Sequence, residues 1–290
     1  MSRAPDRWAD WLMHGRQRGM DRARIAQLNR GLRHIRTRVL ANARLRAGQQ
    51  VLDIGAGTGL LSIEARHRVR SSGRVVALDI SRDALVECWR LATAERSVAP
   101  LHLIVADAVR LPFADGAFHR VMTRSVLIFL ADQPGAVHEL YRVLRRGGRA
   151  SLFEPINSAI EAYIENLGSP MAALQPTHDR IRAHMRANWE HEQTMMGFDE
   201  RDLLRWFVEA GFSKVRLMYW FEHDADNRRR RKATLASLQA RSNPSMMSYE
   251  EAARAVLGGA ADEYLAEFIR LSRAHPRPRP SAVAYVSATR

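Results

Sequence analysis

Cysteine is almost absent from this 290-residue chain, in which Cys88 is the only one. A single thiol can form no intrachain disulfide and no cysteine-rich metal site. It also excludes reaction mechanisms that use two cysteines, such as those that form 5-methylcytosine in RNA. Disulfide scaffolds and thiol-based metal centres are therefore excluded as classes.

Long apolar runs are missing as well. No segment approaches the roughly 20 apolar residues that a membrane span needs, and residues 1–10 carry charges where a signal peptide needs an apolar stretch. We therefore expect a soluble, cytoplasmic protein without a membrane partner. Hydrophobic residues make up 46% of the chain, which is enough for the core of one large domain or of a domain with a substantial lid.

Lysine is scarce, because Lys214 and Lys232 are the only two among 45 basic residues, and the formal net charge is +14. Arginine supplies the rest, with twelve in residues 1–50 and a run at 228–231. These basic segments could bind nucleic acid or an acidic substrate. Solvated helix faces are the more usual place for such charges. Charge alone therefore does not decide between a polyanion-binding surface and a solvated face.

The most informative stretch is Val51–Gly59, where an apolar run ends in an acid and glycine then stands at every second position: Gly55, Gly57 and Gly59. Glycine at such a turn permits positive φ and close approach of a ligand. Several nucleotide-binding folds share this turn. The dinucleotide fingerprint would have its third glycine at position 60, where Leu60 stands.

Asp53 separates the possible cofactors. It ends the apolar run, so a pyrophosphate bound at the start of the following helix would lie close to its carboxylate. Like charges repel there, whereas the ammonium and sulfonium groups of S-adenosylmethionine (SAM) would be attracted. Asp53 therefore favours SAM over NAD.

Strand and helix patterns alternate after Gly48. Ile25, Leu28, Leu32, Ile35 and Val39 recur at intervals of three and four, as on one face of an amphipathic helix. Alternation of this kind predicts an α/β, Rossmann-like fold with a mostly parallel, doubly wound sheet. Seven strands are expected at 50–54, 75–80, 101–105, 118–123, 149–154, 213–221 and 282–288.

We expect an N-terminal helical cap at 1–45 and a main domain at 46–290. Two helical segments, at about 157–196 and 224–280, interrupt the main domain after its fifth and sixth strands. Ligands of open α/β sheets bind beyond the carboxyl ends of the strands, so these insertions are predicted to roof a substrate pocket.

Acidic residues end three successive strands, since Asp79 and Asp107 follow Asp53. Asp79 can accept both ribose hydroxyls, with Ile80 packing on the adenine face. Asp107 and the backbone N–H of Ala108 can bind the adenine edge. One such acid alone would more often be a helix cap or turn residue, but three together indicate a binding site.

These stretches resemble the class I SAM-dependent methyltransferases, most closely the small-molecule branch that includes the ubiquinone and menaquinone methyltransferases, over residues from about 35 to 155. Asp53–Gly59 resembles the first family motif, Leu78–Ser81 the second and Ala106–Ala108 the adenine motif. The resemblance implies SAM as cofactor, S-adenosylhomocysteine as product and no metal. The implied cofactor contacts are Asp53, Gly55, Ala56, Gly57, Gly59, Leu60, Asp79, Ile80, Asp107, Ala108, Arg124 and Ser125.

The end of the fourth strand separates the subclasses of this family. Relatives that methylate exocyclic amines of nucleic-acid bases carry an Asn- or Asp-Pro-Pro-Tyr sequence there, and Arg124–Leu127 is unlike it. This weakens the nucleic-acid interpretation. The chain after Asn243 resembles actinobacterial methyltransferases of largely unassigned substrate, which favours natural-product biosynthesis.

Five residues are candidates for contact with the acceptor. Glu154 and Asn157 follow the fifth strand, although a helix cap would explain them equally well. His184 is preferred over His178 and His191 in the first insertion, although solvated histidines are common there. Trp11 and His14, with Trp8, lie on the segment that closes over the cofactor in small-molecule relatives. Asp224, Asp226 and Asn227 are interpreted as a polar loop rather than as metal ligands.

The sequence identifies no catalytic side chain, because transfer from a sulfonium needs chiefly alignment and exclusion of water. We expect a methyltransferase acting on an O, N or C atom of a small-molecule or peptide natural product. Two alternatives stay open. One is an RNA methyltransferase that uses the basic N-terminal face, and the other is a SAM-binding scaffold without catalysis.

Overall fold

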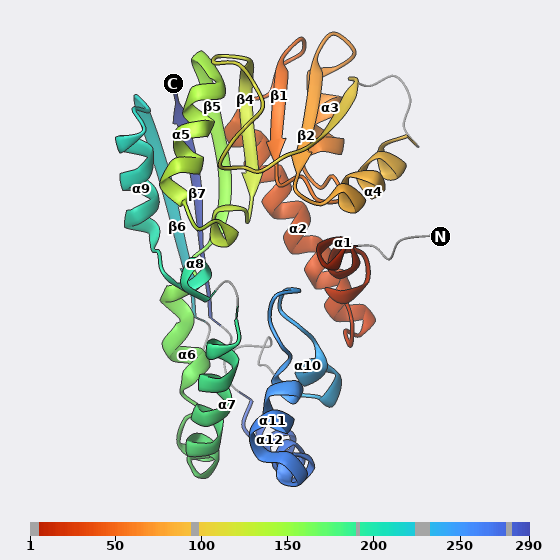
Figure 1. The fold of residues 1–290 in the computed structure, drawn as a ribbon, viewed down its shortest axis with the longest axis vertical. Helices are drawn as coiled ribbons and strands as arrows, with labels where there is room; N and C mark the ends of the chain where they lie inside the picture. The colour runs from red at the N-terminus through yellow and green to blue at the C-terminus, as the bar shows by residue number, and fades with distance from the viewer. Residues whose placement is uncertain (1–5, 94–98, 190–191, 224–232, 277–279) are drawn as a thin grey trace.

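One seven-stranded sheet forms the centre of the structure, a computed structural model that describes residues 6–93, 99–189, 192–223, 233–276 and 280–290 (Figure 1). The strand order is β3-β2-β1-β4-β5-β7-β6. The first five strands are parallel, and β7 runs antiparallel to both β5 and β6. The predicted mostly parallel, doubly wound sheet is thus confirmed. The strands are β1 Gln50–Ile54, β2 Arg74–Asp79, β3 Leu101–Val105, β4 Phe118–Arg124, β5 Leu144–Pro155, β6 Lys214–Glu222 and β7 Ser281–Thr289.

The predicted fifth strand begins too late. Residues 149–154 were expected, but β5 already starts at Leu144, which pairs with Phe118 of β4. The chain passes through Gly147 with a φ of +70°, a value that glycine adopts without steric cost. Strand pairing therefore resumes directly after the preceding helix.

Helices cover both faces of the sheet because successive side chains of each strand point to opposite sides. Val51 faces the core beneath α2 Arg22–Ala43, α3 Ser62–Val69 and α4 Arg82–Ala92. Leu52 and Ile54 face the core beneath α5 Gln133–Val143 and α9 Glu200–Glu209. The acid between them, Asp53, consequently points towards α3.

The two insertions pack against each other as one helical unit, although α9 and β6 separate them in the chain. The first follows β5 and contains α6 Glu161–Glu165, α7 Gln175–Ala187 and α8 Glu192–Met196. The second follows β6 and contains α10 Leu235–Gln239, α11 Tyr249–Leu257 and α12 Ala261–Ala274. Their shared core contains Met171, Ile181, Met185, Leu238, Leu265 and Phe268. This unit lies below the carboxyl ends of the parallel strands in Figure 1.

The N-terminal segment, residues 6–20, joins the sheet to the helical unit. It contains α1 Arg7–Asp10 and one π-helical turn, η1 Trp11–Gly15. At one end Asp6 accepts a hydrogen bond from Ser81 Oγ at 2.6 Å, and its own backbone N–H donates to Asp83. At the other end Trp11 Nε1 donates to the carbonyl of Arg241, at 3.2 Å. The segment therefore lies across the carboxyl edge of the sheet.

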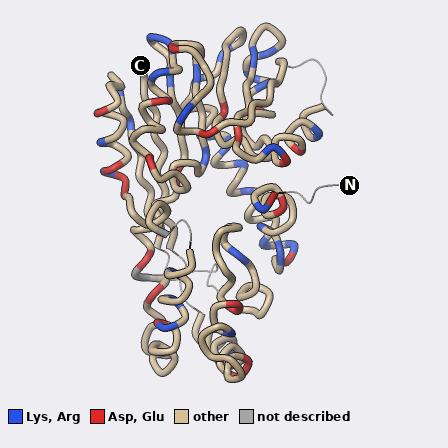
Figure 2. The backbone as a smooth tube through the Cα atoms, viewed as in Figure 1, with Lys and Arg blue, Asp and Glu red and all other residues tan. Residues whose placement is uncertain are grey.

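In the part of the chain that the structure describes, basic side chains are distributed over both the sheet and the helical unit (Figure 2). Figure 2 shows Lys and Arg interspersed with Asp and Glu over the sheet and the helical unit. Half of the arginines of α2, Arg22, Arg30 and Arg33, are exposed as on a solvated helix face, and the others are half-buried. The basic run at 228–232 and the polar loop residues Asp224, Asp226 and Asn227 lie outside the described residues.

Within the described ranges, no helix combines the length and apolar character that crossing a bilayer would require.

Candidate functional site

The glycine loop after β1 has a shape that only glycine allows. Gly55, Gly57 and Gly59 have φ values of +64°, +52° and +91°. A Cβ on Gly55 would overlap Val126 Cγ2, and one on Gly59 would lie 2.6 Å from Cys88 Sγ. Ala56 N–H donates to the carbonyl of Leu78, which ties the loop to β2. The loop is therefore packed against Val126 and Cys88 and held to β2 by a hydrogen bond.

Gly55→Ala should destabilise the protein more than Gly147→Ala. Both positions have positive φ, which costs an alanine about 1–2 kcal/mol. Only Gly55 also faces a neighbouring side chain, whereas an added Cβ at Gly147 meets nothing within 4 Å, so overpacking adds about 1–3 kcal/mol at Gly55 alone. Urea unfolding measures both losses. Equal losses would contradict a tightly packed loop.

Asp53 lies beneath this loop and is only 1% exposed. Ser62 Oγ, at the start of α3, donates to Asp53 Oδ2 at 2.5 Å. Burial raises the pKa of Asp53 to about 7, against the lowering effect of the Ser62 hydrogen bonds, and the charge of Asp79 raises it further. No described basic side chain forms an ion pair with Asp53. A positively charged ligand above the loop would therefore stabilise the ionised carboxylate.

Asp79 holds the loop from the end of β2. Its Oδ2 accepts the N–H of Gly57 at 2.7 Å, and its Oδ1 accepts the N–H of Ser81 at 2.9 Å. Each carboxylate oxygen can accept further hydrogen bonds. Burial and the nearby charge of Asp6 raise the pKa of Asp79. Beside it, the apolar side chain of Ile80 is 68% exposed, which fits a flat ligand group packed on it.

Asp107 follows β3 at the same edge, because Ala106 N–H donates to the carbonyl of Asp79. Its side chain is exposed and accepts the N–H of Val109 at 3.1 Å. Ala108 is half-buried. The structure thus brings together the three acids that the sequence placed at successive strand ends.

Polar groups without partners collect where β4 and β5 end. Ser125 has a φ of +53°, an uncommon backbone conformation for a residue other than glycine. Four buried atoms near these strand ends have no hydrogen-bond partner: Arg16 Nε, Thr123 Oγ1, Arg124 Nε and Glu154 Oε2. Buried polar atoms are nearly always hydrogen-bonded. Their clustering here fits a site whose ligand supplies the missing partners.

Glu154 has two different carboxylate oxygens. Its Oε1 accepts the N–H groups of Val126 and Leu127, at 2.9 and 3.1 Å, which caps the 3₁₀ turn η2 Leu127–Phe129. Its Oε2 has no partner. Burial raises the pKa of Glu154 to about 7, although these backbone hydrogen bonds and the charge of Arg124 lower it.

The other acceptor candidates lie in different surroundings. Asn157 Nδ2 donates to the carbonyl of Met195 at 3.2 Å, which ties β5 to α8. Trp11 is half-buried and bonded to Arg241, while His14 is exposed on the same π-helical turn. His184 is half-buried in the last turn of α7. His191 lies outside the described residues.

His178 has a structural position instead. It is buried in the core of the helical unit, and its Nδ1 lies 2.7 Å from the hydroxyl of Tyr249.

Sequence reasoning missed three contributors to this edge. Asp6 and Ser81 bind each other, and Arg16 lies among the unpartnered atoms. Asp6 carries a local signal, because it precedes a helix and caps it by accepting the N–H of Trp8 and Ala9. Nothing in the sequence distinguishes Arg16 from the other N-terminal arginines. Among the described residues, no three His, Cys, Asp or Glu side chains gather as metal ligands would.

Comparison with known proteins agrees with this geometry. A family model described as a methyltransferase domain matches residues 52–152. A ubiquinone/menaquinone biosynthesis C-methyltransferase of Pseudomonas putida is 33% identical over 179 residues, which are 59% of this chain and 68% of that protein. A demethylmenaquinone methyltransferase of Staphylococcus aureus is 29% identical over 184 residues, or 63% of this chain and 75% of that protein.

The solved structure of YcgJ from Bacillus subtilis has the same fold, with a TM-score of 0.54 at 15% identity, and the match covers 89% of this chain and 98% of YcgJ. The resemblance predicted from the loop and the strand-end acids is confirmed by the sequence relatives. The cofactor is therefore SAM, and the chain belongs to the class I SAM-dependent methyltransferases of the small-molecule type.

Proposed function

We propose that this enzyme methylates an O, N or C atom of a small-molecule or peptide natural product within a chamber beneath the carboxyl edge of the sheet. The observation that carries the proposal is the course of the N-terminal segment. Leu12 approaches Gly57 closely enough that a Cβ there would lie 3.2 Å from Leu12 Cδ1. The ring of Trp8 packs edge-on against Phe129, at 4.8 Å between centroids. One short segment thus touches the cofactor loop and the 3₁₀ turn that follows β4, and bonds to the helical unit.

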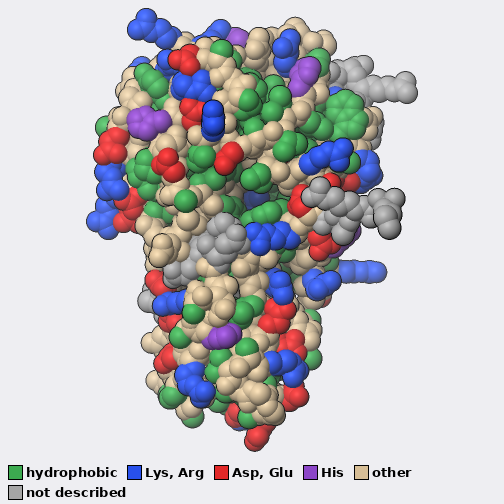
Figure 3. Space-filling view, in the orientation of Figure 1, with side chains coloured by type: hydrophobic (Ala, Val, Ile, Leu, Met, Phe, Trp, Pro, Cys, Tyr) green, Lys and Arg blue, Asp and Glu red, His purple; other side chains and the backbone are tan. Residues whose placement is uncertain are grey.

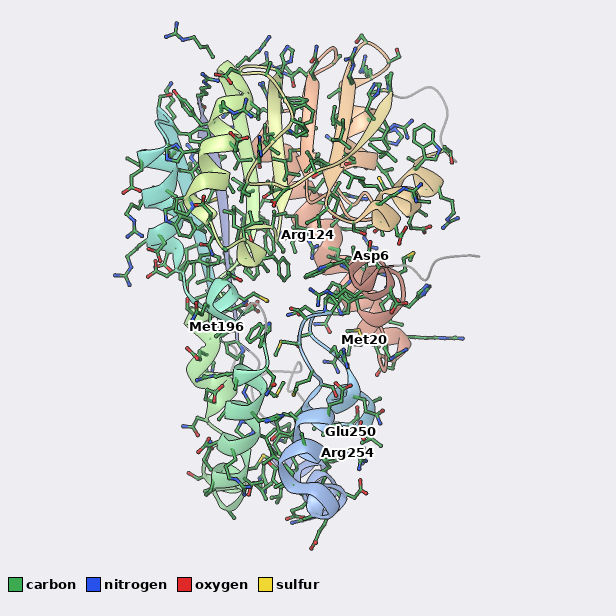
Figure 4. All side chains as sticks on the ribbon, viewed as in Figure 1. Asp6, Met20, Arg124, Met196, Glu250 and Arg254 are labelled. Atoms are coloured by element: carbon green, nitrogen blue, oxygen red, sulfur yellow. The ribbon has the colours of Figure 1, made fainter. Side chains whose placement is uncertain are left out.

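These contacts suggest a role for each part of the chain. Residues 1–45 supply the cap, and 46–290 form the methyltransferase domain, with 157–196 and 224–280 as its lid. Figure 3 shows the surface hollowed at the junction between the sheet and the helical unit. Figure 4 places Arg124 at the upper edge of this junction, with Met196 and Met20 on opposite sides below it. This arrangement suits a ligand with apolar and polar parts.

The residues at the strand ends fit SAM. Asp79 is placed to accept the ribose hydroxyls, Ile80 and the Asp107–Ala108 turn to hold adenine, and the glycine loop with Asp53 to favour the positively charged methionine part. Arg124 ends β4 and Ser125 follows it, and both would lie between the cofactor and the acceptor. When bound, SAM supplies a methyl group on a sulfonium, which leaves readily. The protein aligns the acceptor and excludes water.

Glu154 is the group we assign to proton removal. Its unpartnered Oε2 lies at the end of β5, and its pKa of about 7 lets it exchange a proton at neutral pH. A hydroxyl, an ammonium or an acidic C–H acceptor needs such a base to take its proton. One named relative is a C-methyltransferase of ubiquinone/menaquinone biosynthesis, and the rings of Trp8 and Phe129 would pack on the apolar part of an acceptor.

Incubation of the protein with methyl-labelled SAM and cell extract tests the proposal. We expect label in the low-mass organic or peptide fraction, followed by a product 14 mass units heavier than its acceptor, as any methyl-for-hydrogen exchange requires. The Asp79→Ala variant is the control, because it should label nothing. Label confined to RNA would replace the proposal with the RNA methyltransferase, and absence of label from every fraction would replace it with a scaffold.

A further inference from the structure

Two arginines from distant parts of the chain meet at the carboxyl edge of the sheet. Arg124 is the last residue of β4, and Arg16 directly follows the π-helical turn of the N-terminal segment. The Nε atom of each is buried and has no hydrogen-bond partner. The guanidinium of Arg16 lies over the ring of Trp11, with Cζ 5.9 Å from the ring centroid. Neither arginine forms an ion pair with a described residue.

The charges of these arginines are poorly compensated. Burial, with a smaller effect of the positive charge of Arg16, lowers the pKa of Arg124 to about 10. The acid that opposes this effect is Glu154, which has one oxygen committed to backbone N–H groups. Burying two like charges in one place costs free energy unless a counter-charge is present. Two arginines and one glutamate therefore give the ends of β4 and β5 a surplus of positive charge.

We propose that Arg16 and Arg124 form a subsite for a carboxylate of the methyl acceptor, so that the enzyme selects acidic substrates. Guanidinium groups suit this task because their planar fork of N–H donors matches a carboxylate. The inference rests on the proposed function, since it assumes that the chamber holds the acceptor.

The position of Arg16 favours the acceptor over the cofactor as the source of this carboxylate. Leu12 is the residue that lies against the cofactor loop at Gly57. Four residues further, the segment is turning towards the helical unit, and a Cβ on Gly19 would lie 2.8 Å from atoms of Ala236 in α10. Arg16 lies between these two contacts in the chain, past the residue that touches the cofactor loop and before the one that touches the helical unit. SAM itself carries a carboxylate, so a test must separate the two sources.

Binding of matched acid and amide probes provides the test. The protein is saturated with S-adenosylhomocysteine, and calorimetry compares benzoate with benzamide and hexanoate with hexanamide. Each charge-assisted hydrogen bond should favour an acid over its amide about tenfold or more. Arg16→Gln and Arg124→Gln should remove this preference, and Arg16→Lys should restore part of it. Arg18→Gln is the control variant, because Arg18 is exposed on the same segment, and it should keep the full preference.

Two results would overturn the inference. One is an unmodified protein that binds acid and amide equally in both pairs. The other is an Arg16→Gln variant that loses affinity for S-adenosylhomocysteine but not for its decarboxylated analogue, since the arginine would then hold the cofactor. Failure of the proposed function is distinguishable, because it would appear in the labelling experiment, as label confined to RNA or as no label, whatever the probes do. Thermal unfolding of each variant confirms that it is folded.

Discussion

Replacing Asp79 by alanine should weaken S-adenosylhomocysteine binding about 100-fold or more, since each hydrogen bond to a charged group contributes about 1.5–3 kcal/mol. The carboxylate acts twice. It accepts the N–H groups of Gly57 and Ser81 at 2.7 and 2.9 Å, which shapes the cofactor loop, and we assign it the ribose hydroxyls. Without it, the loop loses its anchor and the ligand loses two acceptors.

Calorimetry with S-adenosylhomocysteine measures this loss. Asp79→Asn retains the shape and one acceptor oxygen, so its loss should be smaller than that of the alanine variant. Asp262→Ala removes an exposed acid of α12 in the helical unit and should leave the affinity unchanged. An alanine variant that binds within about threefold of the unmodified protein would remove Asp79 from the cofactor site.

Replacing Glu154 by glutamine should lower kcat about 100-fold or more, in the range typical for loss of a general base, without changing SAM affinity. The amide oxygen can still accept the N–H groups of Val126 and Leu127, so the 3₁₀ turn that Oε1 now caps should persist. The unmodified enzyme should lose activity as the pH falls below about 7, because protonation consumes the base. The variant should lack this pH dependence.

Stability separates this catalytic role from a structural one. Burial raises the pKa of Glu154 in the folded state to about 7, above the value of about 4.3 for an exposed glutamate. The folded state then binds more protons than the unfolded state between these pH values, so its free energy of unfolding falls as the pH rises through this window. The glutamine variant should escape this loss and be at least as stable at pH 8. Full activity combined with lower stability would show that Glu154 only caps the turn.

The sequence predicted what local patterns encode. Alternating apolar residues predicted the strands, and the glycine spacing predicted the cofactor loop. Asp79 ends β2 beside this loop, as its place in the sequence predicted. For Glu154, the sequence favoured neither of two roles, contact with the substrate or a helix cap. The structure shows the cap at Oε1 and leaves Oε2 without a partner, so the two interpretations do not exclude each other.

Long-range packing could not be predicted from these patterns. Strand β7 lies antiparallel between β5 and β6. This position depends on pairing with two strands that lie far upstream in the sequence. The shared core of the two insertions joins Met171 to Phe268 across about 100 residues. Arg16 resembled every other N-terminal arginine in sequence, and the docking of its segment, through Asp6 on Ser81 and Trp8 on Phe129, brings it to the strand ends.

The N-terminal segment has a consequence for the exchange of a ligand bound beneath it. Leu12 covers Gly57 while the bonds of Asp6 to Ser81 and Asp83 fasten one end of the segment and that of Trp11 to Arg241 fastens the other. A ligand beneath such a strap exchanges only as fast as the strap detaches. Spent cofactor held beneath the segment would leave only after these hydrogen bonds break, so variants that remove them should release S-adenosylhomocysteine faster.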